Sequence, residues 1–118
     1  MATTPNRLLE VRVYTLKPGG RGEFDRLFRE GAMPLLVKHG ITVVGFGPSL
    51  HDPNGYFLMR AYPSLEERAR VLEGFYGSEE WLTRWDPPVM ALIDSYGTVV
   101  IDAGPEAIEA LALRTVHA

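Results

Sequence analysis

A regularly alternating segment near the amino terminus constrains the fold more than any other feature of the chain. Between residues 8 and 16, aliphatic and polar side chains alternate, which is the period of a strand with one buried face. One side has Leu9, Val11, Val13 and Thr15, and the other has Glu10, Arg12 and Tyr14. We expect the aliphatic side to meet helices and the polar side to face away from them.

After this strand, the pattern of apolar residues changes to a helical period and then back to that of strands. Apolar side chains recur three and four apart over residues 24–36, which predicts a helix that Pro34 kinks and that ends near His39, before Gly40. Residues 41–47 and 56–62 are rich in β-branched and aromatic side chains and predict the two strands of a hairpin.

The second half of the chain repeats this order of helix and strand. Ser64 and Glu67 form a capping box that starts a helix, and a short helix from Ser78 is expected to stop at residues 86–88, Asp-Pro-Pro. Residues 95–102 predict a last strand, and the tail from Gly104 predicts a weak helix. The fold class is therefore α+β.

The resulting order, βαββαβ, predicts a ferredoxin-like fold. Right-handed crossovers place the first and third strands at the centre of a four-stranded, antiparallel-containing sheet. A chain of 118 residues suits one domain. We expect a disordered or extended segment over residues 1–7, the domain over residues 8–102 and a C-terminal tail over residues 103–118.

Charge and composition exclude several classes of partner. The 15 acidic and 12 basic residues are spread along the chain and give a formal charge of −3, which argues against nucleic acid as a partner. The absence of cysteine excludes disulfides and thiolate metal sites and fits a cytoplasmic location. Neither a targeting segment nor a membrane span is expected from the sequence.

Residues 9–19, Leu-Glu-Val-Arg-Val-Tyr-Thr-Leu-Lys-Pro-Gly, resemble the opening strand of the NIPSNAP family. Further matching features follow in order over residues 8–101, namely His39-Gly40, Val44-Gly45-Phe46, Tyr62, Ser64-Leu65-Glu66-Glu67-Arg68 and Glu80-Trp81. The resemblance implies a dimeric α+β barrel, in which two sheets face each other and enclose a cavity in each protomer. Members commonly have histidine and tryptophan where Leu58 and Arg60 stand here.

The polar side of the first strand is the main candidate for chemistry. Arg60 and Tyr62 have the same parity on the neighbouring strand, so in a face-to-face dimer all these side chains would line a cavity. Arg12 and Arg60 carry two positive charges, and Glu10 can balance one of them. The remaining charge would attract an anion, unless Asp102 from the last strand extends into the cavity. The alternatives are a solvated sheet face in a monomer and a structural pair of Glu10 with Arg12.

The remaining candidates are histidines and aromatic residues. The three histidines, His39, His51 and His117, have no metal-ligand spacing, and His39 suits a helix C-terminus. His51, in the hairpin loop, could move a proton at the cavity mouth. The catalytic candidates are Glu10, Arg12 and His51, and the ligand-binding candidates are Tyr14, Phe46, Arg60, Tyr62, Trp81 and Trp85. The tryptophans also suit a core or a dimer contact.

Two functional hypotheses follow. The first is a homodimer that binds a small apolar or aromatic molecule with an anionic or enolisable group, and that acts as a cofactor-independent monooxygenase or isomerase, chemistry that the family fold also houses. The second is a non-catalytic dimeric binding or adaptor protein. Neither glycine-rich stretch, residues 19–22 or 45–47, has the order of strand, G-x-G-x-x-G and helix that binds a nucleotide, so we expect no cofactor. The spacing of the histidines predicts that there is no metal site either.

Overall fold

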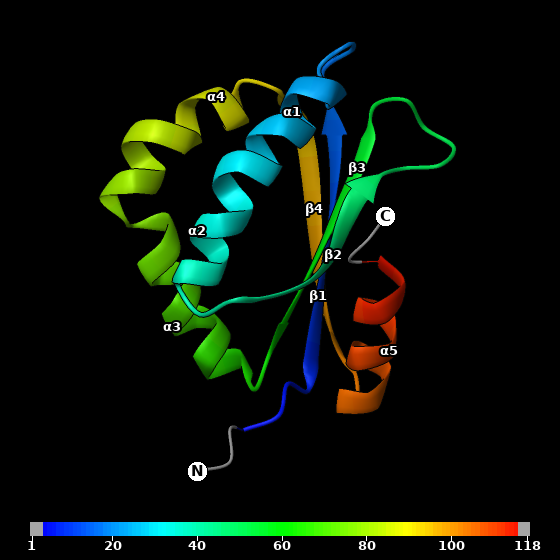
Figure 1. The fold of residues 1–118 in the computed structure, drawn as a ribbon, viewed down its shortest axis with the longest axis vertical. Helices are drawn as coiled ribbons and strands as arrows, with labels where there is room; N and C mark the ends of the chain where they lie inside the picture. The colour runs from blue at the N-terminus through cyan, green and yellow to red at the C-terminus, as the bar shows by residue number, and fades with distance from the viewer. Residues whose placement is uncertain (1–3, 116–118) are drawn as a thin grey trace.

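The chain forms one four-stranded antiparallel sheet with helices on both faces (Figure 1). The computed structural model describes residues 4–115. The strands lie in the order β2-β3-β1-β4, with bounds β1 Leu8–Leu16, β2 Thr42–Pro48, β3 Gly55–Tyr62 and β4 Ile93–Asp102. β1 pairs antiparallel with both β3 and β4. This is the predicted α+β ferredoxin-like fold, with the first and third strands at the centre.

The first helical segment is continuous but changes its winding. It consists of α1 (Arg21–Leu27), the π-helical turn η1 (Phe28–Ala32) and α2 (Met33–Lys38). Pro34 has no N–H to give to the carbonyl of Glu30, and a π-helical turn before it is a common way for a helix to absorb such a defect. The chain then turns at Gly40 in the left-handed region, with φ +78°.

The second helical segment differs from the prediction at its end. α3 (Leu65–Tyr76) starts at Ser64, whose hydroxyl accepts the Glu67 N–H at 3.1 Å, while the Glu67 carboxylate bonds to Arg70. A π-helical segment, η2 (Trp81–Trp85), follows. The expected stop at residues 86–88 is wrong, because α4 (Asp86–Met90) begins there. η2 runs into α4 without a break, and this π-helical turn precedes the two prolines just as η1 precedes Pro34.

The helices divide unequally between the two faces of the sheet. α1 to α4 cover one face, and α5 (Pro105–Thr115) lies on the other, where it packs on β2 (Figure 1). α5 is the helix that forms in the tail after Gly104. None of the described helices has both the length and the apolar character that crossing a bilayer requires.

The two sides of β1 are oriented opposite to the sequence expectation. Glu10, Arg12 and Tyr14 point toward α1 to α4, and Leu9 and Val11 point to the other face, where α5 packs. The same holds for β3, since its Tyr-Leu-Arg-Tyr side lies under the helices. Alternation identifies the side chains that share a face, but not the face that receives the larger helical layer. Here the bulky tyrosine rings fill that core.

The outer face of the sheet is apolar and partly open. α5 covers Leu9, Val44, Met59 and Ala61. Beyond it, Val13, Val99 and Ile101 keep exposed fractions of 56%, 53% and 46%. The face expected to be polar and to line a cavity is thus buried in the protomer, and the exposed face is the aliphatic one.

Candidate functional site

A buried ion network lies between the sheet and α3. Glu10 on β1 and Arg60 on β3 are cross-strand partners, and they form an ion pair in which Glu10 is 0% and Arg60 1% exposed. Arg68 on α3 reaches the other carboxylate oxygen of Glu10 at 2.7 Å. The Tyr62 hydroxyl adds a hydrogen bond to Glu10 at 3.3 Å. The predicted pair of Glu10 with Arg12 does not form.

This network keeps Glu10 ionised. Burial raises the pKa of Glu10, but the charges and hydrogen bonds of Arg60 and Arg68 outweigh it and hold the pKa below its ordinary value. Burial also raises the pKa of Tyr62, so its phenol stays protonated and donates to the carboxylate. A carboxylate that is occupied in this way is a poor general base, because its oxygens already accept from charged donors.

Arg12 is held by aromatic rings instead of by a carboxylate. Its Nε donates to the Tyr14 hydroxyl at 2.9 Å, and its guanidinium carbon lies 4.8 Å from the centre of the Tyr96 ring. Within residues 4–115, no carboxylate forms an ion pair with Arg12. Arginine cannot lose its proton in a protein, so this charge is permanent.

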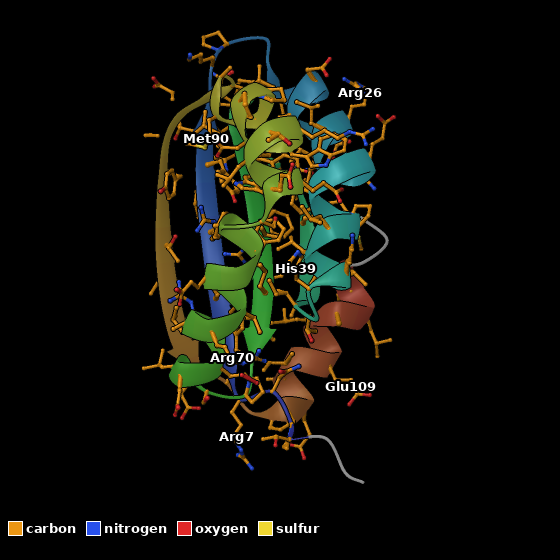
Figure 2. All side chains as sticks on the ribbon, turned by 90° about the vertical axis from the view of Figure 1, so that its left-hand side faces the viewer. Arg7, Arg26, His39, Arg70, Met90 and Glu109 are labelled. Atoms are coloured by element: carbon orange, nitrogen blue, oxygen red, sulfur yellow. The ribbon has the colours of Figure 1, made fainter. Side chains whose placement is uncertain are left out.

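Arg12 opens into a cavity of about 260 Å³ between the β1–β4 edge of the sheet and the helices opposite. We call it the Arg12 pocket, and its walls are Arg12, Tyr76, Trp81, Asp86, Met90, Ile93 and Tyr96. Figure 2 places Met90 at the end of the helical layer that is opposite to Arg70. Most of the wall is aromatic or apolar, and Arg12 and Asp86 are its two charged residues.

Tyr76 connects the pocket to the buried network. Its hydroxyl accepts a hydrogen bond from Nη1 of Arg60 at 3.1 Å. The Nη2 group of Arg60 is buried and has no hydrogen-bond partner among the described residues. Three arginines therefore lie in this region, and Glu10 is the buried counter-charge of two of them, Arg60 and Arg68, but not of Arg12.

The other predicted site residues lie apart from this pocket. Phe46 is buried against Phe28, with ring centres 4.7 Å apart. Trp85 packs on Gly31, whereas Trp81 is a wall of the pocket. Asp102, the suggested second carboxylate, is exposed and belongs to none of the ion pairs found in residues 4–115.

The histidines do not join the Arg12 pocket either. His51 is exposed in the hairpin loop, where its Nδ1 lies 3.1 Å from the Ser49 hydroxyl, and it lines a separate pocket beside Val13 and Phe57. His39 caps α2 and meets the Phe75 ring edge-on at 5.8 Å. His117 lies outside the described residues. Among residues 4–115, no three metal-ligating side chains come together.

A larger cavity, of about 590 Å³, lies near the other end of the helical layer, around His39, Tyr62, Glu67 and Arg70. Its charged side chains are already satisfied, because Glu67 pairs with Arg70 and the Tyr62 hydroxyl bonds to Glu10. The Arg12 pocket differs from it in presenting a cation that lacks a carboxylate partner.

Comparison with known families decides the relationship of this chain. The family model for NIPSNAP proteins matches residues 9–101. The chain belongs to the NIPSNAP family. The resemblance of the opening strand is thereby confirmed, and no curated protein matches the chain.

Solved structures share the fold of this NIPSNAP chain. A NIPSNAP family protein from Agrobacterium tumefaciens superposes with a TM-score of 0.78 at 20% identity, covering 92% of this chain and 95% of that one. An uncharacterised NIPSNAP domain protein from Burkholderia xenovorans gives 0.75 at 17% identity, with 82% and 94% covered. A candidate antibiotic biosynthesis monooxygenase from Nitrosomonas europaea gives 0.63 at 16% identity, with 81% and 97% covered. At such low identities the likeness shows the fold alone.

The sequence analysis did not predict six residues of this NIPSNAP site, of which four are polar: Arg68, Tyr76, Asp86 and Tyr96. The other two are Met90 and Ile93. Tyr96 had a signal, because the last strand pairs with the first and places Tyr96 opposite Tyr14. Arg68, Tyr76 and Asp86 belong to the helical layer. Their positions became predictable only once the polar side of β1 was known to face that layer.

Proposed function

We propose that this NIPSNAP protein binds a small, planar, anionic molecule in the Arg12 pocket. The observation that supports it is the state of Arg12, a permanent cation at the wall of an aromatic cavity with no carboxylate partner among residues 4–115. A charge in such a partly desolvated place is stabilised by an oppositely charged ligand. The site is therefore suited to a carboxylate, phenolate or enolate.

The balance of charge supports an anion. Glu10 is occupied by Arg60 and Arg68, so it is not available to Arg12. Asp86 is the carboxylate at the pocket wall, and it forms no ion pair with Arg12 within 4.0 Å. Asp86 lowers the positive electrostatic potential in the pocket, but it does not provide Arg12 with a direct ion-pair partner.

The rest of the lining supports an aromatic ligand. Trp81 and Tyr96 contribute aromatic side chains to the wall, and Met90 and Ile93 contribute apolar ones. The volume of about 260 Å³ lies below the usual range of drug-sized pockets, roughly 300–1,000 Å³. A compact ligand with one anionic group fits these dimensions better than an extended one.

Binding is favoured over proton-transfer catalysis. Glu10 is fully buried and ion-paired, and His51 lines another pocket, so neither of the acid–base candidates predicted from the sequence lines the Arg12 pocket. Monooxygenase or isomerase activity remains the second candidate. It is favoured only by the fold that the chain shares with a candidate antibiotic biosynthesis monooxygenase.

The proposal includes a homodimer. The outer face of β1 and β4 exposes Val13, Val99 and Ile101 beside the part that α5 covers. Burying such a face is favourable by about 25 cal/mol per Å² of apolar surface, and a second copy offers the same apolar surface. The Arg12 pocket lies on the opposite side of the sheet, so each protomer would keep its own site.

The binding proposal is tested with 4-nitrophenolate and its uncharged analogue 4-nitroanisole, using calorimetry and tryptophan fluorescence. We expect the anion to bind at least about tenfold more tightly. Arg12→Met should weaken anion binding by about 1.5–3 kcal/mol, the scale of a hydrogen bond to a charged group, and leave 4-nitroanisole binding unchanged.

Arg26→Met is the matched control. Arg26 is exposed and pairs with Glu23 and Glu30 on the first helical segment, so its removal should not alter either affinity. Equal affinity of the wild type for the two probes, or an unchanged affinity of Arg12→Met for the anion, would contradict the proposal.

A further inference from the structure

The Tyr76 hydroxyl stands between the Arg12 pocket and the buried ion network. Tyr76 is the last residue of α3 and lines the pocket. On its inner side it accepts a hydrogen bond from Nη1 of Arg60 at 3.1 Å. Arg60 is in turn fixed by its ion pair with Glu10. This gives a chain of three side chains that leads from a sealed carboxylate to the pocket wall.

The hydrogen-bonding capacity of the Arg60 guanidinium determines whether the Tyr76 hydroxyl donates or accepts in their hydrogen bond. A guanidinium donates and cannot accept, so the Tyr76 oxygen must be the acceptor in its bond with Arg60. The single phenolic hydrogen is then left for another partner. In the part of the chain that the structure describes, no acceptor for it is found.

The Tyr76 ring is held firmly by its neighbours. It meets the Phe75 ring edge-on at 4.8 Å and the Trp81 ring edge-on at 5.6 Å. The Arg60 guanidinium carbon lies 5.9 Å from its centre. The ring position is fixed, and so is the hydrogen bond that the oxygen accepts, which makes the hydroxyl a preorganised donor. Such a group needs little reorganisation when a ligand binds.

We infer that Tyr76 donates a hydrogen bond to the anionic oxygen of a phenolic or enolic ligand in the Arg12 pocket, with Arg60 and Glu10 as positioning residues. This inference rests on the proposed function and specifies its ligand class. Arg12 supplies the charge, and Tyr76 supplies a second donor from the opposite wall of the pocket. Both contacts favour the ionised form of a bound phenol over its neutral form.

The consequence is a measurable shift in the ionisation of the ligand. A phenol entering the pocket gives its proton to the solvent buffer, and its oxygen remains bound as the phenolate. Loss of the Tyr76 donor should weaken phenolate binding about tenfold, which corresponds to about one unit in the pKa of the bound phenol. A purely structural role of Tyr76 would not move that pKa.

The test uses 4-nitrophenol, whose absorbance distinguishes the phenol from the phenolate. We expect the wild-type protein to lower the pKa of the bound probe. In Tyr76→Phe the pKa of the bound probe should rise by about one unit, while 4-nitroanisole binds as before. Tyr56→Phe is the matched control, because it removes a phenol whose hydroxyl bonds at 2.6 Å to Asp25, outside the pocket.

A second variant guards against loss of folding, since Tyr76→Phe leaves Nη1 of Arg60 without its acceptor. Site-specific replacement of Tyr76 by 3-fluorotyrosine keeps the oxygen and makes the phenol a stronger donor, so the pKa of the bound probe should fall below the wild-type value. If the probe binds but its pKa is the same in all variants, the inference is wrong and the proposed function stands. If the wild type does not bind the probe at all, both are overturned.

Discussion

Glu10 shows how one buried carboxylate can organise a core. It is fully buried, and two arginines from different elements, Arg60 and Arg68, meet at its oxygens. Removing one member of such a buried network leaves the others with uncompensated charge, which is far more destabilising than the absence of the whole network. Glu10 is therefore better understood as the anchor of Arg60 than as a base.

The folding stability should depend on pH through Glu10. Because the pKa of Glu10 is lower in the folded chain than its ordinary value of 4.5, the stabilisation is complete above that ordinary value. It is lost as pH falls from there through the lower folded pKa. Urea unfolding between pH 7 and pH 3 measures this loss.

The Glu10→Gln variant isolates this contribution. We expect it to be less stable at pH 7 by about 3–5 kcal/mol, because Arg60 loses its buried counter-charge, and to show a flatter dependence on acid. A Glu66→Gln variant, at an exposed position in the first turn of α3, is the control. The same pH dependence in Glu10→Gln and in the wild type would show that Glu10 does not govern acid stability.

At the residue scale, the sequence predicted part of the site and misplaced another part. Strand alternation grouped Glu10, Arg12 and Tyr14 correctly, because the strand period depends only on local geometry. Alternation could not show that Glu10 would form its ion pair with Arg60 instead of with Arg12. That choice depends on cross-strand register, which pairs Glu10 with Arg60 and Arg12 with Leu58.

At the element scale, a glycine lies at the closest contact described between the two helical segments. Gly31, in the π-helical turn η1, lies directly against the Trp85 ring of η2, and a Cβ atom at Gly31 would overlap that ring. The sequence indicated the helices, because their apolar periods and caps are local. It gave no sign of this contact, because a glycine within a helix has no sequence pattern that identifies its neighbour.

Gly31→Ala should therefore destabilise the protein even though alanine is the better helix former. The helical gain of about 0.5–1 kcal/mol is smaller than the overpacking cost of about 1–3 kcal/mol in a filled core, so we expect a net loss in thermal unfolding. Gly22→Ala is the control, because no heavy atom lies within 4 Å of its Cβ position. A melting temperature of Gly31→Ala at or above that of Gly22→Ala would contradict the close packing of Gly31 and Trp85.

At the scale of the whole molecule, the placement of the helices decides which surface is left for a partner. α1 to α4 bury the polar side of β1, and α5 covers only the β2 side of the opposite face (Figure 1). The order of elements allowed the sheet topology to be predicted, because crossover handedness leaves few choices. It did not show which face of β1 would stay open, and the face that was expected to meet a second copy is buried under the helices.

We expect the protein to be a homodimer that associates through the outer face of β1 and β4. The exposed side chains Val99 and Ile101 lie on the edge strand β4, where introduced charge opposes both face-to-face and edge-to-edge association. Light scattering with size exclusion at micromolar concentration should give a dimer mass for the wild type and a monomer mass for a double variant, Val99→Lys with Ile101→Lys.

Leu65→Lys is the control, because Leu65 is 63% exposed but lies at the start of α3, in the helical layer on the other face of the sheet. A monomer mass for the wild type would overturn the dimer, and a dimer mass for the double variant would place the interface elsewhere. Since the Arg12 pocket lies on the helical side of the sheet, the monomeric double variant should still bind 4-nitrophenolate with wild-type affinity.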